Sequence, residues 1–317
     1  MKQALIEGSS IYQIGGQPGH QAEELIFALK SVIAKYIKEG KQFIIQSSDL
    51  AKFFDKELIE DVISTSLNRG ANPKSCRLWY KLNENTRIRV RTGVGMTDYV
   101  EVGAIVGQGT IGGTLVSQGV IDERISDNFT PGGGDELTFG SVPMAPFIFM
   151  DDIIHGAETI EDARRGNIRI NRTVMQLNLT LNRDKTVCMV LGSTKQRMKL
   201  KKELLDKPLI CGDFETHLKD KFKWLGQILS CKGLGDSVSE TVASREGKIR
   251  GTCLEIAQIV NNWRSRVIGG METALLLWEA CYIPSLLSGA GTWTEITATT
   301  EKKLNILQCW YLKLVFR

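Results

Sequence analysis

The spacing of apolar side chains predicts helices and strands in alternation along the first part of the chain. Residues 20–41 carry apolar side chains at helical spacing, and Gly40 is placed to end that helix. The apolar run at 42–46 predicts a strand. A second helical pattern covers 49–70, so Asp49 stands where the chain passes from the strand into a helix.

The middle of the chain contains patterns typical of a hairpin, a helix and a further strand. Residues 87–102 alternate polar and apolar side chains, as a β-hairpin does. Residues 107–125 begin as a glycine-rich loop and continue as a helix. The mostly apolar residues 141–150 predict a strand that ends at Asp151 and Asp152.

The remaining residues repeat this alternation in a looser form and then become helical. The patterns predict a helix near 157–177, a strand at 186–192, a basic helix and a short hairpin within 209–230. From Gly233 onward the pattern is helical to the end of the chain. We therefore expect an α+β fold, in which an antiparallel sheet backed by helices is followed by a helical domain, with the boundary near 230.

Composition narrows the class of protein. The chain has 317 residues, of which 42% are hydrophobic and 24% charged, as in globular proteins, and this length predicts two domains. The sequence opens without an apolar stretch of signal-peptide length, and no run approaches the ~20 apolar residues that cross a bilayer. We therefore expect an intracellular protein, in the nucleus or cytoplasm, that is neither secreted nor bound to a membrane. The seven scattered cysteines and three histidines argue against a disulfide framework and a zinc site.

Charge is distributed unevenly along the chain. From residue 183 onward there are 21 Lys and Arg against 14 Asp and Glu, an excess of +7, although the whole chain carries only +4. Residues 195–207 hold six of these cations. Such a run can follow the phosphates of a nucleic acid, and a solvated helix face explains it equally well.

The stretch FIFMDDII (147–154) places two adjacent carboxylates between apolar triplets. An unpaired carboxylate taken out of water costs several kcal/mol, so Asp151 and Asp152 either lie at an exposed turn or hold cations. An acidic β-turn explains this pair without chemistry, and helix N-capping explains Asp49 in the same way. The order of these residues with a glycine-rich loop and Lys185 favours the chemical alternative.

Five segments in one order resemble the reverse transcriptases of non-LTR (LINE-type) retrotransposons. They are SSDLAKFFDKE (47–57), VGQGTIGG (106–113), FMDD (149–152), LNRDKTVCMVLG (181–192) and DKFKWLGQILS (220–230). A further segment, LLSGAGTW (286–293), is similar to one on the thumb side of these enzymes. The resemblance covers nearly the whole chain from about residue 9.

The resemblance implies a polymerase palm at 43–230, a remnant of the fingers at 1–42 and a helical thumb-like region at 231–317. It implies an RNA-directed DNA polymerase whose partners are an RNA template, a DNA primer and deoxynucleoside triphosphates. Two Mg²⁺ ions, for which Mn²⁺ can substitute, would lie roughly 4 Å apart. Their ligands, expected at one edge of the sheet, would be Asp49, Asp151 and Asp152.

The resemblance also implies roles in binding substrates. Phe54 would discriminate the sugar, Gln108 and Gly109 would allow close approach of template and nucleotide, and Lys185 would face the triphosphate. The residues of the implied primer grip are Phe222, Trp224 and Gly226. Ordinary structural explanations stay open, namely a helix core for Phe54, a turn lysine for Lys185 and a core-packing aromatic strand for the primer-grip residues.

Two features depart from the family pattern. Gly16 and Gln17 stand where the family usually has Phe-Arg, and few of the finger cations that bind the triphosphate are present. After Gln108 and Gly109, TIGGTL replaces the usual Asp-Pro-Leu-Ser-Pro. The alternative is therefore a truncated or degenerate retrotransposon-derived nucleic-acid-binding module without polymerase activity, which would extend a primer poorly. A P-loop enzyme is excluded, because no Gly-Lys-Ser/Thr follows the glycines at 107–113.

Overall fold

The structure is a computed structural model of the 317-residue chain. It describes residues 13–15, 17, 19–51, 53–101, 113–129, 137–139, 142–144, 146–264 and 270–316. The chain forms two compact units, Met1–Lys219 (unit 1) and Asp220–Arg317 (unit 2). The predicted C-terminal boundary of the palm at residue 230 stays a prediction. The hairpin formed by residues 221–230 belongs to unit 2.

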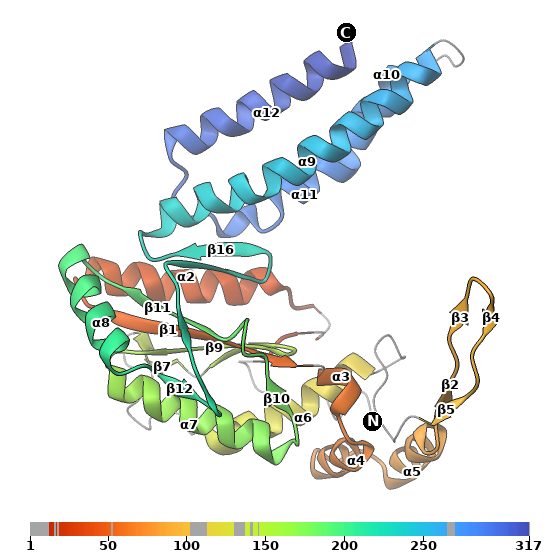
Figure 1. Ribbon diagram of the computed structural model, residues 1–317, viewed down its shortest axis with the longest axis vertical. Helices are drawn as coiled ribbons and strands as arrows, with labels where there is room; N and C mark the ends of the chain where they lie inside the picture. Colours follow the sequence, from red (N-terminus) through yellow and green to blue (C-terminus); the bar gives the residue numbers. More distant parts are fainter. Residues whose placement is uncertain are drawn as a thin grey trace. The chain divides into compact units, whose positions relative to one another are not determined.

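Unit 1 is built on a central sheet whose neighbouring strands are antiparallel except for one pair (Figure 1). In spatial order its strands are β14 (His217–Leu218), β11 (Val187–Leu191), β1 (Phe43–Ala51), β9 (Asp152–Ala157) and β8 (Phe147–Phe149), and β10 (Thr180–Leu181) pairs with the end of β1. Together with the helices described below, this arrangement confirms the predicted α+β fold class.

Strand β1 lies at the centre of the sheet because both of its faces are apolar. Successive side chains of a strand point to opposite faces. Phe43 packs on Tyr36 of α2 (Ala22–Lys38), with ring centroids 5.0 Å apart, while Ile44 belongs to a core cluster with residues of α7 (Ile160–Gln176) and α8 (Thr194–Asp206). The predicted helices near 20–41 and 157–177 and the basic helix are thus confirmed, and together they cover the sheet.

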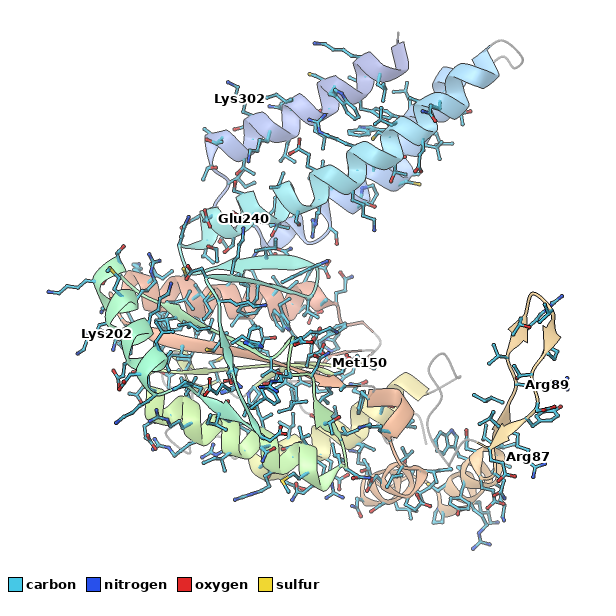
Figure 2. All side chains as sticks on the ribbon, in the orientation of Figure 1. Arg87, Arg89, Met150, Lys202, Glu240 and Lys302 are labelled. Atoms are coloured by element: carbon cyan, nitrogen blue, oxygen red, sulfur yellow. The ribbon has the colours of Figure 1, made fainter. Side chains whose placement is uncertain are left out.

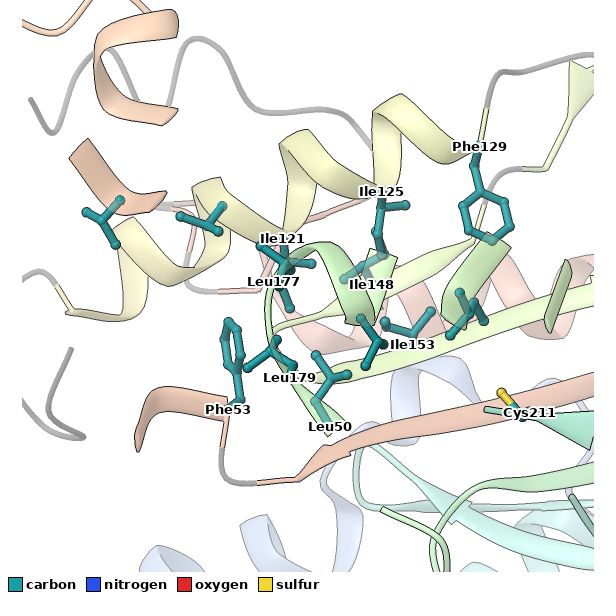
Figure 3. Close-up of a cluster of buried hydrophobic side chains, with 14 of the residues drawn as sticks. Leu50, Phe53, Ile121, Ile125, Phe129, Ile148, Ile153, Leu177, Leu179 and Cys211 are labelled. Atoms are coloured by element: carbon teal, nitrogen blue, oxygen red, sulfur yellow. The ribbon is translucent and has the colours of Figure 1, made fainter. Parts of the chain in front are cut away.

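A second apolar cluster lies beneath the end of β1 and joins it to helices α6 (Gly113–Asn128) and α7 (Figure 3). Leu50, Ile148 and Ile153 are members of this cluster and are at most 3% exposed. Their positions along the chain flank Asp49 and the pair Asp151–Asp152. The backbone that presents these carboxylates is therefore anchored in the core on both strands.

The predicted helix at 49–70 is wrong in its first part. Strand β1 continues to Ala51, and two shorter helices follow, α3 (Phe53–Lys56) and α4 (Ile59–Asn68). The reason is strand pairing, since Asp49 lies opposite Asp152 of β9 and Leu50 lies opposite Leu181 of β10. Asp49 is therefore a strand residue and not the N-cap of a helix.

The predicted hairpin at 87–102 forms an arm that follows α5 (Pro73–Asn83). Its strands are β2 (Arg87–Ile88), β3 (Arg91–Thr92), β4 (Gly95–Met96) and β5 (Val100–Glu101). All side chains of these strands are exposed, and Figure 2 shows Arg87 and Arg89 on the arm. The arm is held mainly by its own pairs, such as the 2.7 Å contact between Arg87 and Glu101.

Three further short pairs of strands complete the described β-structure. The predicted strand at 141–150 is divided into β7 (Val142–Pro143) and β8, with Pro146 between them, because proline offers no N–H to a ladder. The short hairpin predicted within 209–230 is two hairpins. One hairpin pairs β12 (Ile210–Cys211) with β13 (Phe214–Glu215), and the other pairs β15 (Lys221–Trp224) with β16 (Gln227–Ser230). Strand β7 pairs with β6 (Thr138–Phe139).

Unit 2 is helical after its β15–β16 hairpin, as the pattern from Gly233 onward predicts. Its helices are α9 (Leu234–Arg264), α10 (Gly270–Leu277), a π-helical turn (Trp278–Tyr282), α11 (Ile283–Leu287), a 3₁₀ turn (Ala290–Thr292) and α12 (Ala298–Phe316). Trp278 stacks on Tyr311 with ring centroids 4.4 Å apart, and both are buried. This aromatic pair links α12 to the middle of the unit.

One stretch in the described part of the chain, Glu272–Thr292, is long and apolar enough to cross a membrane by length and composition. Its mean hydropathy is 1.2, and 22% of its most apolar window is buried. Trp278, Tyr282 and Leu286 of this stretch pack in the core of unit 2. A core helix of a globular domain passes the same test, so this single stretch is weak evidence for a membrane span.

Candidate active site

The structure brings two of the three predicted carboxylates together across adjacent strands. Asp49 of β1 lies directly opposite Asp152 of β9 in an antiparallel register. Directly opposed side chains on one face have Cβ atoms about 4.5–5.5 Å apart. Asp151 is the next residue along, and its carbonyl accepts a 3.3 Å hydrogen bond from the backbone N–H of Leu50. All three carboxylates therefore belong to one edge of the sheet.

The turn between β8 and β9 presents Asp151 and Asp152. Met150 in this turn has φ of +60°, which is uncommon for a residue other than glycine. Figure 2 shows Met150 near the end of the sheet that carries these residues. The acidic-turn explanation applies to Asp151, whereas Asp152 already pairs within the central sheet.

Burial and mutual repulsion disfavour the charged forms of the two turn carboxylates. Desolvation raises the pKa of Asp152 to about 6, and the neighbouring Asp151 and Asp49 add to this rise. Desolvation and Asp49 likewise raise the pKa of Asp151. The nearby Lys185 ammonium acts in the opposite direction on both. A cation at this edge would therefore stabilise a cluster that is strained by like charges.

Lys185 is the fourth charged group of the site. Its Nζ donates a 3.2 Å hydrogen bond to Asp49 Oδ1, and the lysine side chain is 66% exposed while that of Asp49 is 13% exposed. The loop that carries Lys185 is fixed to β1, because the N–H of Asn182 donates to the carbonyl of Asp49 at 2.8 Å. The contact raises the pKa of Lys185, so the side chain is positively charged at neutral pH.

The donor set fits a hard divalent cation in its chemistry. Carboxylate oxygens are ligands that Mg²⁺ and similar ions prefer, and the like charges need neutralising. Within the described residues, however, no three His, Cys, Asp or Glu side chains are gathered closely enough to hold a metal ion. In the present arrangement the Lys185 ammonium accompanies Asp49, and a bound cation would compete with this contact.

Comparison with known proteins identifies the fold. No protein-family model matches the sequence, and no curated protein matches it. Telomerase from Candida tropicalis, solved in complex with a TWJ fragment of telomeric RNA, is similar with a TM-score of 0.50 and 10% identity, over 99% of this chain and 55% of that chain. Telomerase from Candida albicans, also in complex with a TWJ fragment of telomeric RNA, gives a TM-score of 0.46 and 8% identity, over 93% and 44%.

The chain has a reverse-transcriptase-like fold. This follows from the similarity to telomerase, a reverse transcriptase, over most of the chain and from the mostly antiparallel sheet with its helical C-terminal region. The chain spans between 38% and 55% of the length of the telomerase chains it matches. At such low sequence identity the likeness concerns the fold alone.

Other predicted residues of the reverse-transcriptase-like site are only partly described. Gln108 and Gly109 and the side chain of Phe54 lie outside the described residues. Of the implied primer grip, the side chains of Phe222 and Trp224 are 8% and 2% exposed, as a strand that packs a core also predicts. These residues belong to unit 2, and the carboxylates belong to unit 1. Their roles stay predictions.

The hairpin of the implied primer grip is held by a residue that the sequence patterns did not indicate. Its turn consists of Leu225 and Gly226, with φ of +44° and +79°. Arg245 of α9 donates to the carbonyl of Gly226 through Nη2 and to the carbonyls of Leu286 and Ser288 through Nη1, each at 2.8 Å. Arg245 thus connects this turn to the LLSGAGTW segment. These are the two most C-terminal of the segments that carry the resemblance.

A pH dependence follows from the raised pKa of Asp152. A divalent cation binds a deprotonated carboxylate, and the free carboxyl is protonated below its pKa of about 6. Cation affinity at this edge should therefore rise as the pH increases through about 6 and level off above it. Mn²⁺ titrations followed by electron paramagnetic resonance across this range check the expectation, which an affinity independent of pH would contradict.

Proposed function

We propose that the chain is the reverse transcriptase domain of a non-LTR-type retrotransposon, an RNA-directed DNA polymerase that acts inside the cell. The observation that carries the proposal is the pairing of Asp49 with Asp152 in register, with Asp151 beside them and Lys185 in contact. The five sequence segments in family order and the reverse-transcriptase-like fold support the same activity.

In this proposal the described residues divide the work of nucleotidyl transfer. Asp49, Asp151 and Asp152 would hold two Mg²⁺ ions, which when bound activate the primer 3′-hydroxyl and neutralise the triphosphate. Lys185 is exposed and positively charged beside the carboxylates, so its ammonium can meet the negative charge of an incoming deoxynucleoside triphosphate. The buried neighbours of the carboxylates keep this edge rigid, which favours positioning of the reacting groups.

A second candidate is a nucleic-acid-binding module without polymerase activity. It is favoured by the contact between Lys185 and Asp49, which places an internal cation where a metal would bind, and by the lack of a gathered ligand set among the described residues. The Candida tropicalis telomerase of similar fold was solved with an RNA fragment, and this supports nucleic-acid binding in both candidates.

Primer extension separates the two candidates. The chain is incubated with a DNA primer on an RNA template, deoxynucleoside triphosphates and Mg²⁺ or Mn²⁺, beside a variant carrying Asp151→Ala and Asp152→Ala. Extension by the chain that is lost in the variant supports the polymerase. Retention of primer-template binding without extension in either protein supports the second candidate. Extension of equal rate in both would contradict the assignment of the carboxylates.

The basic helix α8 provides a separate test of nucleic-acid binding. It begins three residues after Leu191, which pairs with Phe43 at the end of β1 opposite to Asp49. Asp49 is the sixth residue after Phe43 along the strand, which corresponds to about 20 Å. Figure 2 accordingly shows Lys202 on a different side of unit 1 from Met150. A contact of α8 with a phosphate backbone would thus be independent of the carboxylates.

Replacing Lys199, Lys201 and Lys202 by Gln should weaken binding and make it less dependent on salt. Each lost phosphate contact makes the slope of log affinity against log salt concentration less negative by about 0.7–0.9. Fluorescence anisotropy with a labelled RNA–DNA hybrid measures this slope. The matched control is Glu203→Gln on the same helix, which removes an exposed negative charge and should not flatten the slope. An unchanged slope in the triple variant would identify the basic run as a solvated face.

A further inference from the structure

We propose that Gln13 is a positioning residue that fixes the turn presenting Asp151 and Asp152. This inference rests on the proposed function of that turn. Gln13 lies far from the turn in sequence, but it forms a parallel bridge with Ile148, two residues before Met150. Neither composition nor the sequence motifs assign a role to Gln13.

The side chain of Gln13 makes the contacts that such a role needs. Its Oε1 accepts a 3.3 Å hydrogen bond from the N–H of Met150 and a 3.1 Å bond from the N–H of Gly15. One amide oxygen thus ties the turn to the N-terminal segment. Gln13 is 0% exposed, so water does not compete for these donors.

The backbone of Gln13 extends this connection to α6. Its carbonyl accepts a 3.3 Å bond from Gln118 Nε2 and a 2.6 Å bond from Gln17 Nε2. Helix α6 packs on α7 and contributes to the apolar cluster beneath the carboxylates. The segment around Gln13 is therefore fixed by the core, and it can transmit that rigidity to the turn.

Met150 is the residue of the turn that most needs an external partner. Its φ of +60° is disfavoured for a side chain with a Cβ, and its N–H lies in a buried environment. Without the Gln13 oxygen this N–H has no other hydrogen-bond partner among the described contacts, and a buried donor without an acceptor is costly. Loss of the bond should let the turn relax and move Asp151 and Asp152 relative to Asp49.

Gly15 provides independent evidence that this segment is shaped for the turn. A Cβ at Gly15 would lie 2.7 Å from the backbone nitrogen of Met150, which is closer than such atoms approach, and 3.0 Å from its Cγ. The backbone at Gly15 therefore approaches the turn as closely as only glycine permits. Any larger residue there must push the turn away from Gln13.

Hydrogen exchange tests the contact itself, without reference to catalysis. In the unsubstituted chain the amide of Met150 should be protected. In Gln13→Met, which keeps the volume of the side chain but lacks the acceptor, exchange in the segment 147–154 should accelerate about 10-fold, and Gly15→Ala should do the same. Gln258→Met is the matched control, because Gln258 is an exposed glutamine of α9 in unit 2, outside the unit that contains the turn.

Mn²⁺ binding tests the consequence for the carboxylates. The affinity should fall about 10-fold in Gln13→Met and stay unchanged in Gln258→Met. Rapid exchange of the Met150 amide in the unsubstituted chain would overturn the proposal even if the variants fail to fold, and so would unchanged exchange in both variants. If exchange responds but the unsubstituted chain binds no Mn²⁺ through Asp49 and Asp152, the contact stands and the proposed function fails.

Discussion

Replacing Asp49 by Asn should lower divalent-cation-dependent nucleotide incorporation by about 10³-fold, because a bound cation supplies several kcal/mol of stabilisation to the transition state. Asn keeps the shape of the side chain and an oxygen that can accept from Lys185, so the fold should be preserved. It removes the negative charge that lies opposite Asp152 in the register of β1 and β9. The loss should therefore appear as weaker Mn²⁺ binding as well as slower incorporation.

The matched control is Asp184→Asn. Asp184 is an exposed carboxylate beside Lys185 in the same loop, but it lies outside the sheet register. Mn²⁺ affinity from electron paramagnetic resonance and single-nucleotide incorporation on an RNA template should both match those of the unsubstituted chain. If Asp49→Asn and Asp184→Asn behave alike, the site has been assigned to the wrong edge of the sheet.

Local patterns predicted those parts of the fold in which burial follows a regular spacing. The helix at 20–41 appears as α2, because its apolar residues at helical spacing are buried, and the helix contacts β8 and packs Tyr36 on Phe43 of β1. The strand at 186–192 appears as β11, whose five residues are all buried. In these segments the hydrophobic surface alone decides the structure, so periodicity is a sufficient signal.

The same patterns failed where long-range pairing decides the structure. Ser48 and Asp49 suit a helix N-terminus, and the apolar residues after them fit a helix from 49 onward. In the structure β9 and β10 instead extend β1 to Ala51. Hydrogen bonds between distant segments thus overrode a local preference, and the result places Asp49 in the register on which the candidate site depends.

The motifs located the carboxylates but not the residues that support them. Asp49, Asp151 and Lys185 stand in segments whose order resembles the reverse-transcriptase motifs, so the sequence pointed to them. Gln13 and Arg245 act by binding backbone groups, namely the N–H of Met150 and the carbonyls around Gly226. A backbone group can be offered by any residue type, so such contacts leave no pattern in the sequence of the partner.

Replacing Arg245 by Met should destabilise unit 2 by about 2–3 kcal/mol, because hydrogen bonds to a charged donor are lost and carbonyls are left without their partner. The three carbonyls belong to Gly226, Leu286 and Ser288. The bonds to Ser288 and Gly226 are exposed, so water can replace the arginine there, and the expected loss of stability is smaller than the sum of three buried hydrogen bonds. The side chain of Met preserves most of the packing of the arginine stem, so the change reports on the hydrogen bonds.

Denaturant unfolding followed by tryptophan fluorescence measures this loss, since five of the six tryptophans lie in unit 2. Lys248→Met on the same helix is the control, and because Lys248 is exposed its effect should stay within about 0.5 kcal/mol.

If the β15–β16 hairpin is the primer grip, Arg245→Met should also weaken binding of a primer-template while Mn²⁺ binding in unit 1 stays unchanged. Equal stability of the two variants would show that the Arg245 contacts do not hold the turn, whereas a loss of stability with full primer-template affinity would separate the hairpin from primer binding.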